Sequence, residues 1–246
     1  MDEELKKENN HKETSPKKKM SIGKEIFQIG IFAVIIFAFK SSFLGNFTVP
    51  TGSMEPNIMP GDKLIADMRC YNIRIPFTSI SLWKVADPEV GDIVVFDYPK
   101  DRWTNYVKRL VGKPGDVLEV RDGFIIRNGE PFSTSPSDED FLEEILESGG
   151  EYQESNGLFS YTVQRKPHDP MFADDSDLRA FVIPEGNYFF MGDNRDQSSD
   201  SRVWGFVPAD HIRGKAKFVY YSSDSEPGWF TLPKRIRYER IGIVLK

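Results

Sequence analysis

The chain begins with a polar segment, continues with an apolar one, and then alternates short apolar runs with turn-forming residues. Residues 1–21 hold almost no apolar side chains and mix both charges, which predicts a disordered tail. The next fourteen residues, 26–39, contain a single polar side chain. A spanning helix needs about 20 residues. Apolar residues on both sides extend the segment to 22–44, which is long enough.

Three interpretations of residues 22–44 compete. A cleavable signal peptide requires a small-x-small processing site, and none occurs between Ala38 and Val49. A buried core helix is expected to show an amphipathic face, whereas this segment is apolar all round. An uncleaved transmembrane signal anchor fits best. Lysines crowd before the segment, so the positive-inside rule places residues 1–21 in the cytoplasm and residues 45–246 outside.

The region after residue 45 reads mainly as short strands. Eight runs are rich in β-branched and aromatic residues and are bounded by Gly, Pro, Asp or Asn. They are 62–67, 91–98, 105–112, 116–120, 124–127, 158–164, 187–191 and 215–221. Residues 139–147 have the spacing of an amphipathic helix. We therefore predict a mainly β fold, an antiparallel β-sheet domain at 45–246 with an inserted β-rich subdomain at about 121–184, preceded by a single transmembrane helix.

Charge and composition exclude several classes of function. A net charge of −6 over 246 residues argues against nucleic-acid binding. The single cysteine, Cys70, excludes an intramolecular disulfide and a thiolate zinc site. The three histidines, His11, His168 and His211, show no ligand spacing and are interpreted as ordinary surface residues. We expect no metal and no cofactor. A Ser-His-Asp triad through His211 stays open, although no Gly-x-Ser-x-Gly motif supports it.

The first candidate segment is 47–62. Its three prolines exclude a helix and keep it extended or turned. If it is extended, Thr51 points to the same side as Ser53, where two hydroxyl groups face one reacting carbonyl. The alternative is a Pro-rich linker with an incidental serine, and this segment alone favours the linker.

The second candidate segment is 106–112, in a predicted strand. Alternation places Lys108 on one face with Tyr106 and Leu110. Apolar neighbours desolvate the amine and lower its pKa. Bringing a lysine from about 10.4 to about 7–8 takes roughly 4 kcal/mol, and a neutral lysine serves as a general base. The alternative, a lysine at a strand edge reaching into water, is commoner in general.

The third candidate segment is 191–205, which is too polar for a core strand. Asp200 and Arg202 are spaced to pair with each other, and Ser198 is available to orient another polar group. The alternative is a solvated turn.

Together the three segments resemble a known family. Thr-Gly-Ser-Met-Glu-Pro at 51–56, Tyr-Val-Lys-Arg-Leu-Val-Gly at 106–112 and the run from Gly192 to Gly205 look like signature segments of bacterial type I signal (leader) peptidases. They occur in the family's order, behind a predicted anchor. The resemblance covers residues 26–246 apart from the insertion. Gln197 and Thr51 are mild departures that keep the needed functional groups.

The resemblance implies a membrane-anchored Ser–Lys endopeptidase of the inner (plasma) membrane that removes signal peptides from exported preproteins after small residues of the Ala-x-Ala type. Ser53 is then the nucleophile and Lys108 the general base. The Ser53 N–H and the Thr51 hydroxyl form the oxyanion hole, Ser198 orients Lys108, and Asp200 with Arg202 supports the site. The implied substrate-binding residues are Phe47, Val49, Pro50, Met54, Ile58, Tyr106 and Val107. Implied partners are signal peptides, membrane lipid and, as a further candidate, the export translocon. A silent binding module and a self-cleaving Ser–Lys regulator are the rival functions.

Overall fold

The computed structural model describes residues 22–74, 81–137, 139–166, 177–224 and 236–245. The chain divides into two units, residues 1–38 and 39–246. Helix α1 (Ile22–Phe43) lies where the sequence predicts a helix. Across the described ranges, no helix is long and apolar enough to cross a membrane. The tail expected at 1–21 is outside the described residues.

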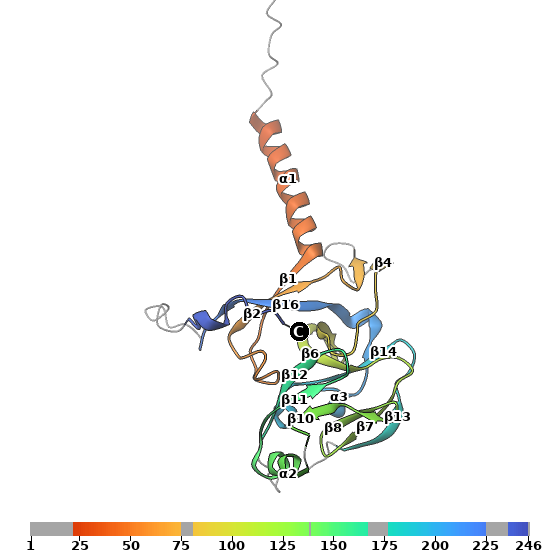
Figure 1. The fold of residues 1–246 in the computed structure, drawn as a ribbon. Coiled ribbons are helices and arrows are strands. Elements are labelled where there is room, and N and C mark those ends of the chain that lie inside the picture. Colours follow the sequence, from red (N-terminus) through yellow and green to blue (C-terminus); the bar gives the residue numbers. More distant parts are fainter. Residues whose placement is uncertain (1–21, 75–80, 138, 167–176, 225–235, 246) are drawn as a thin grey trace, which may run out of the picture. The chain divides into compact units, whose positions relative to one another are not determined.

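The centre of the larger unit is a seven-stranded antiparallel sheet (Figure 1). Its strands come from both ends of the sequence, and β16 lies between β2 and β5. In sheet order they are β1 (Leu44–Thr48), β2 (Asp62–Asp67), β16 (Ile212–Ser222), β5 (Ile93–Tyr98), β6 (Asp101–Gly112), β14 (Asn187–Met191) and β15 (Val207–Pro208). The fold is therefore mainly β, as predicted.

Two further sheets are formed by the chain between β6 and β14. A four-stranded sheet has the order β13-β7-β8-β9 and a three-stranded sheet the order β10-β11-β12. Their strands are β7 (Val117–Arg121), β8 (Phe124–Arg127), β9 (Glu130–Pro131), β10 (Ser133–Ser135), β11 (Gly150–Ser155), β12 (Ser160–Arg165) and β13 (Leu178–Val182). Because β7 pairs with β8 and β13, these sheets begin before the predicted boundary at 121.

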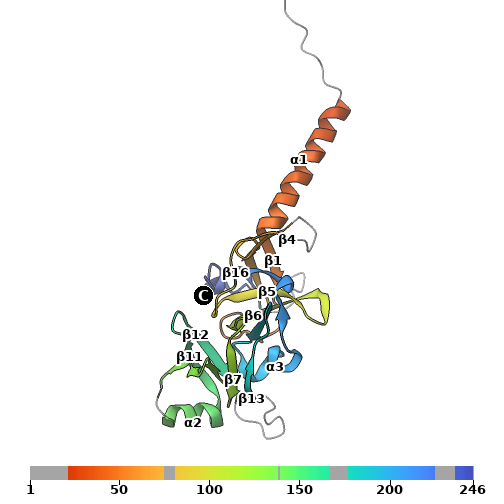
Figure 2. The same ribbon diagram turned by 90° about the vertical axis from the view of Figure 1, so that its right-hand side faces the viewer.

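The helix predicted at 139–147 is present as α2 (Glu139–Ser148). It lies at the end of the inserted strands (Figure 2). Its Ile145 packs with Tyr152, Tyr161 and Val163 of the three-stranded sheet. The acidic face of this helix thus stays in solvent while its apolar stripe completes a small core.

Shorter elements complete the larger unit. Strands β3 (Asn72–Arg74) and β4 (Ser81–Lys84) form a two-stranded sheet. The third candidate segment contains a 3₁₀ turn, η2 (Arg195–Gln197), and a short helix, α3 (Ser201–Trp204). Two more 3₁₀ turns are η3 (Ala209–His211) and η5 (Tyr238–Arg240).

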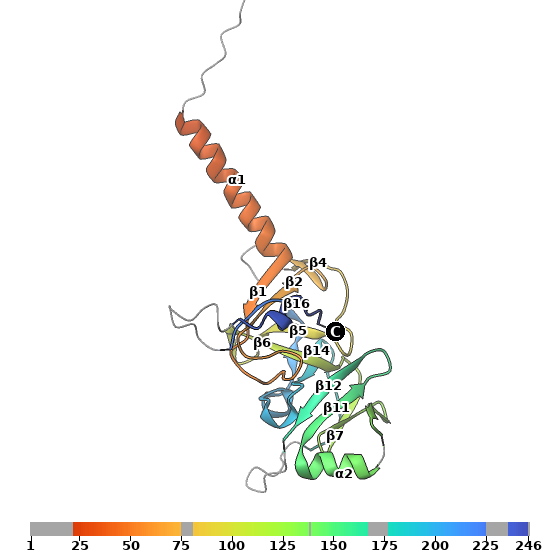
Figure 3. The ribbon, with the colours of Figure 1, turned by 60° about the vertical axis from the view of Figure 1, so that its left-hand side comes forward.

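The core lies on both faces of β5. Ile93 and Val95 pack in one cluster, whereas Val94 and Phe96 pack in another. Burial on both faces explains why this strand is apolar at consecutive positions. Strand β6 lies beside β5 (Figure 3) and carries the second candidate segment in its C-terminal half. Pairing with β5 therefore fixes the position of this segment.

Candidate active site

The segment around Ser53 is a closed loop anchored in the core. Val49 N donates to the Asp62 carbonyl and Gly61 N to the Val49 carbonyl, both at 2.9 Å, which closes the base of the loop. Met54 and Ile58 are fully buried in the main core cluster. The loop is therefore a packed part of the domain, which argues against the linker interpretation.

Lys108 lies in the middle of β6 and is 2% exposed. Its Nζ donates a hydrogen bond to Ser53 Oγ, which comes from the loop between β1 and β2. The ring centroid of Tyr106, on the same strand face, is 5.7 Å from Nζ. Two residues 55 positions apart in sequence are thus in direct contact in a largely water-free place.

Burial is the dominant influence on Lys108 and lowers its pKa to about 8. The negative charges of Asp200 and Asp193 oppose this shift, and the positive charge of Arg202 adds to it. At pH 8 about half of the amines at such a site are neutral. A neutral amine beside a hydroxyl group can accept its proton.

Thr51 is exposed beside the serine. Its Oγ1 lies 3.5 Å from Ser53 Oγ, so the two hydroxyl groups are on the same side of the loop. A carbonyl oxygen placed next to Ser53 would be within reach of a second hydroxyl donor.

Asp200 and Arg202, which the sequence pairs, form a buried ion pair with N–O distances of 2.9 and 2.8 Å. Burial alone would raise the pKa of the Asp200 carboxyl, but the hydrogen bonds and charge of Arg202 keep it below its usual value. The Gly192 N–H also donates to this carboxylate, at 3.0 Å. Asp200 thus ties the start of α3 to the loop that follows β14.

Ser198 is placed next to the site without bonding to Lys108. Its buried Oγ helps to lower the pKa of Asp200, yet it forms no hydrogen bond of ordinary geometry with a described residue. A Cβ at Gly192 would collide with Ser198 Oγ and with the Ser53 carbonyl. Only glycine fits at that position, because the backbones of the two segments are so close.

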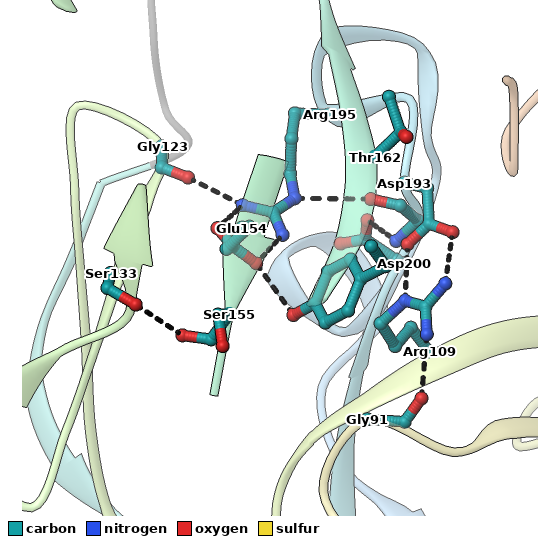
Figure 4. Close-up of polar contacts among 12 residues, drawn as sticks. Gly91, Arg109, Gly123, Ser133, Glu154, Ser155, Thr162, Asp193, Arg195 and Asp200 are labelled. Carbon is teal, nitrogen blue, oxygen red and sulfur yellow. Dashed lines mark hydrogen bonds and ion pairs between the residues drawn. The ribbon is translucent and has the colours of Figure 1, made fainter. Parts of the chain in front are cut away.

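Asp193 is a buried carboxylate that the sequence analysis missed. Arg109, the residue after Lys108, donates to both its oxygens at 2.8 Å (Figure 4). Asn57 also donates to Asp193, at 2.8 Å. Asp193 and Arg109 are 0% and 1% exposed. The sequence did contain a signal for this pair, because Arg109 and Asp193 carry opposite charges in two candidate segments and buried charges are usually paired.

A second missed pair joins the inserted sheet to the same loop. Arg195 forms an ion pair with both carboxylate oxygens of Glu154 of β11 (Figure 4). Tyr161 of β12 also donates to Glu154, at 2.7 Å. The Gly123 carbonyl accepts from the Arg195 guanidinium at 3.2 Å. The polar third segment is therefore held by buried hydrogen bonds at residues 192–195 and at Asp200, while Asp196, Gln197 and Ser199 are exposed.

The implied substrate-binding residues lie in different environments. They comprise buried core residues (Val49, Met54 and Ile58), half-buried ones (Phe47, Tyr106 and Val107) and the exposed Pro50. Their role in substrate binding stays a prediction.

The expectation that His211 is a surface residue is wrong. It is 4% exposed, and its Nδ1 lies 3.0 Å from the Asp97 carbonyl of β5. The η3 turn places it against the backbone of β5, which the polar sequence context does not reveal. His11 and His168 are outside the described residues.

A mainly β domain in which a serine contacts a buried lysine defines a candidate serine hydrolase, and comparison with known proteins gives the family. The family described as "Signal peptidase, peptidase S26" matches residues 21–221. The chain belongs to this family and is a serine endopeptidase. The assignment indicates removal of signal peptides from preproteins.

Individual relatives agree. A signal peptidase I of Pseudomonas fluorescens is 34% identical over 233 residues, covering 90% of this chain and 78% of the relative. One of Rickettsia canadensis is 37% identical over 193 residues, covering 72% and 71%. A crystal structure of a signal peptidase I from Enterococcus faecalis V583 is 28% identical over 53% of this chain and 97% of that one; its TM-score of 0.34 is too low to bear on the fold.

The buried lysine makes stability depend on pH in a specific way. Because its pKa is about 8 when folded and 10.5 in its ordinary state, unfolding takes up a proton between these values. The free energy of unfolding should therefore rise by about 3 kcal/mol from pH 8 to 10.5 through this group alone. Denaturant unfolding of the wild type and Lys108→Met should differ by a pH-dependent amount of that size. The difference for Lys100→Met, an exposed control, should be flat; a flat difference for Lys108→Met would contradict the burial argument.

Proposed function

We propose that this chain removes signal peptides from exported preproteins through an acyl-enzyme intermediate, with Ser53 as nucleophile and Lys108 as general base. The single observation that carries the proposal is the hydrogen bond between Lys108 Nζ and Ser53 Oγ in a site where the lysine is 2% exposed. A lysine with a pKa of about 8 is partly neutral near pH 8, and its hydrogen bond to Ser53 is the path along which it can accept the serine's proton.

The reaction follows from this contact. Neutral Lys108 takes the Ser53 proton as Oγ attacks the scissile carbonyl. The oxyanion receives hydrogen bonds from the Ser53 N–H and the Thr51 hydroxyl. Lys108 then gives its proton to the leaving amine, and the C–N bond breaks to leave an ester on Ser53. Water, deprotonated by Lys108, attacks that ester and releases the signal peptide's carboxylate, with the proton returning to Ser53.

The neighbouring groups have supporting roles in this proposal. The Asp200–Arg202 pair fixes the loop beside the lysine and sets the charge that acts on it. Ser198 Oγ is buried with no hydrogen bond of ordinary geometry to a described residue, so it is available to orient Lys108 during the reaction.

The proposed substrate binds as an extended strand, with small residues of the Ala-x-Ala type before the cleaved bond. Half-buried Phe47, Tyr106 and Val107 flank the dyad in sequence and are the apolar surface that we assign to shallow pockets. Large substrate side chains would not fit in these proposed pockets, because closely packed core residues leave no space beneath them.

We further propose that residues 22–44 attach the protein to the inner (plasma) membrane, with residues 1–21 cytoplasmic and the catalytic domain outside. Supporting this, the large apolar side chains of α1 that the structure describes are exposed; they include Ile26, Phe27, Ile29, Phe32, Val34 and Ile36. Attachment would bring the enzyme to substrates held in the same bilayer by their signal peptides, and to the translocon as a candidate partner.

The dyad is tested with preprotein processing. Ser53→Ala should abolish cleavage, because no nucleophile is left. Lys108→Arg should reduce kcat/KM at least about 1,000-fold, because arginine keeps the charge but does not release its proton. Lys100→Arg is the exposed control. The wild-type rate should rise with pH to a midpoint near 8. Cleavage by Lys108→Arg at a rate near that of the wild type would rule out this base.

Membrane attachment is tested by alkaline carbonate extraction of membranes from cells that produce the full chain. The wild type should remain in the membrane pellet. Ile29→Lys combined with Val34→Lys should move it to the supernatant, since charges at the centre of a membrane helix are costly. Matched polar changes on the exposed face of α2, Glu143→Lys with Glu147→Lys, should leave it in the pellet. Release of the wild type by carbonate would refute the proposed anchor.

A further inference from the structure

The turn that carries Ser53 is fastened to the loop after β14 by two asparagine side chains. Asn194 contacts it directly: its backbone N–H donates to the Ser53 carbonyl at 3.2 Å, and its Nδ2 donates to the Gly52 carbonyl at 3.1 Å. Asn57, one turn after the serine, donates through Nδ2 to Asp193 at 2.8 Å. Both peptide groups next to the nucleophile are therefore held from outside its own loop.

The lysine is held by the same carboxylate. Arg109 follows Lys108 in β6 and binds Asp193 through two hydrogen bonds of 2.8 Å. Successive strand residues point to opposite faces, so Arg109 bonds on one side of β6 while Lys108 reaches Ser53 on the other. Asp193 thus connects the strand that positions the base with the turn that positions the nucleophile.

The inserted sheet braces this junction. Asn57 Nδ2 also donates to the Thr162 carbonyl at 2.6 Å, and Gln164 N donates to the Asp193 carbonyl at 2.9 Å. Gln164 of β12 forms an isolated bridge with Asn194. The two asparagines therefore connect the turn that carries Ser53 with the inserted sheet and with the loop after β14.

Two features indicate that these contacts serve the geometry of the reaction. A carboxamide donates hydrogen bonds without bringing a charge close to Lys108, whose pKa responds to nearby carboxylates. In addition, Asn194 is fully buried and its Oδ1 has no hydrogen-bond partner among the described residues. An unsatisfied buried acceptor is costly, so a side chain that served only stability would be poorly chosen.

We infer that Asn57 and Asn194 are positioning residues that set the distance and direction between Ser53 Oγ and Lys108 Nζ. The inference rests on the proposed function of that pair. Neither asparagine touches the reacting atoms; each acts by holding the backbone that carries them. A displacement of the nucleophile by about 1 Å costs roughly 100-fold in rate, so a lost tether should appear in catalysis more than in binding.

The test compares full-length Asn57→Ala and Asn194→Ala with Asn187→Ala in preprotein processing. Asn187 is a matched control, because its side chain also donates to a backbone carbonyl, that of Glu185, but in an exposed turn. Each site variant should lose about 10- to 100-fold in kcat with KM within about threefold, and the pH midpoint near 8 should not move. Asn187→Ala should match the wild type.

Circular dichroism gives the folded fraction, so that kcat is stated per folded molecule. If Asn194→Ala does not fold, Asn194→Ser replaces it, since a serine hydroxyl is too short to reach the Gly52 carbonyl. Wild-type kcat in both variants, or a rise in KM at unchanged kcat, would overturn the inference. If Ser53→Ala still cleaves, the proposed function fails and the inference with it. If Ser53→Ala is inactive while both asparagine variants keep wild-type kcat, only the inference is wrong.

Discussion

The contact between the buried amine of Lys108 and the hydroxyl of Ser53 is the constraint on which the site depends. An amine in this position has to be largely out of water to be neutral near pH 8, and it has to be next to the serine to act on it. Strand β6 meets the first requirement, because it lies between β5 and β14 in the main sheet. The core-anchored turn at Ser53 meets the second.

Around this amine the protein pairs almost every buried charge. Arg109 binds Asp193, Arg195 binds Glu154 and Arg202 binds Asp200, each within a largely buried pair. Removing one partner of such a pair leaves an uncompensated charge, at a cost of about 3–5 kcal/mol. These pairs fix the loop after β14, whereas Lys108 has no ion-pair partner among the residues that the structure describes. Burial therefore lowers the pKa of Lys108, and the charges of Asp200 and Asp193 offset that shift only in part.

Many of the strands and the three candidate segments could be predicted from the sequence, because each is marked by a short run of neighbouring residues. The runs at 62–67, 124–127 and 187–191 coincide with β2, β8 and β14. Strands β9, β11 and β15 were not predicted, because β9 and β15 have two residues each and β11 is mostly polar. The roles of Asp193 and Glu154 were not predicted either, because their arginines are distant in sequence, and only the folded sheets bring them together.

The most direct test is the pKa of Lys108 itself, measured by NMR on full-length protein with isotope-labelled lysine side chains. The Lys108 signal is assigned by its disappearance in Lys108→Met, and its shift is followed from pH 6 to pH 11. The structure predicts a midpoint near 8. A midpoint near the ordinary value of 10.5 would contradict the account, because a lysine that is still almost wholly charged at pH 8 cannot take the serine's proton.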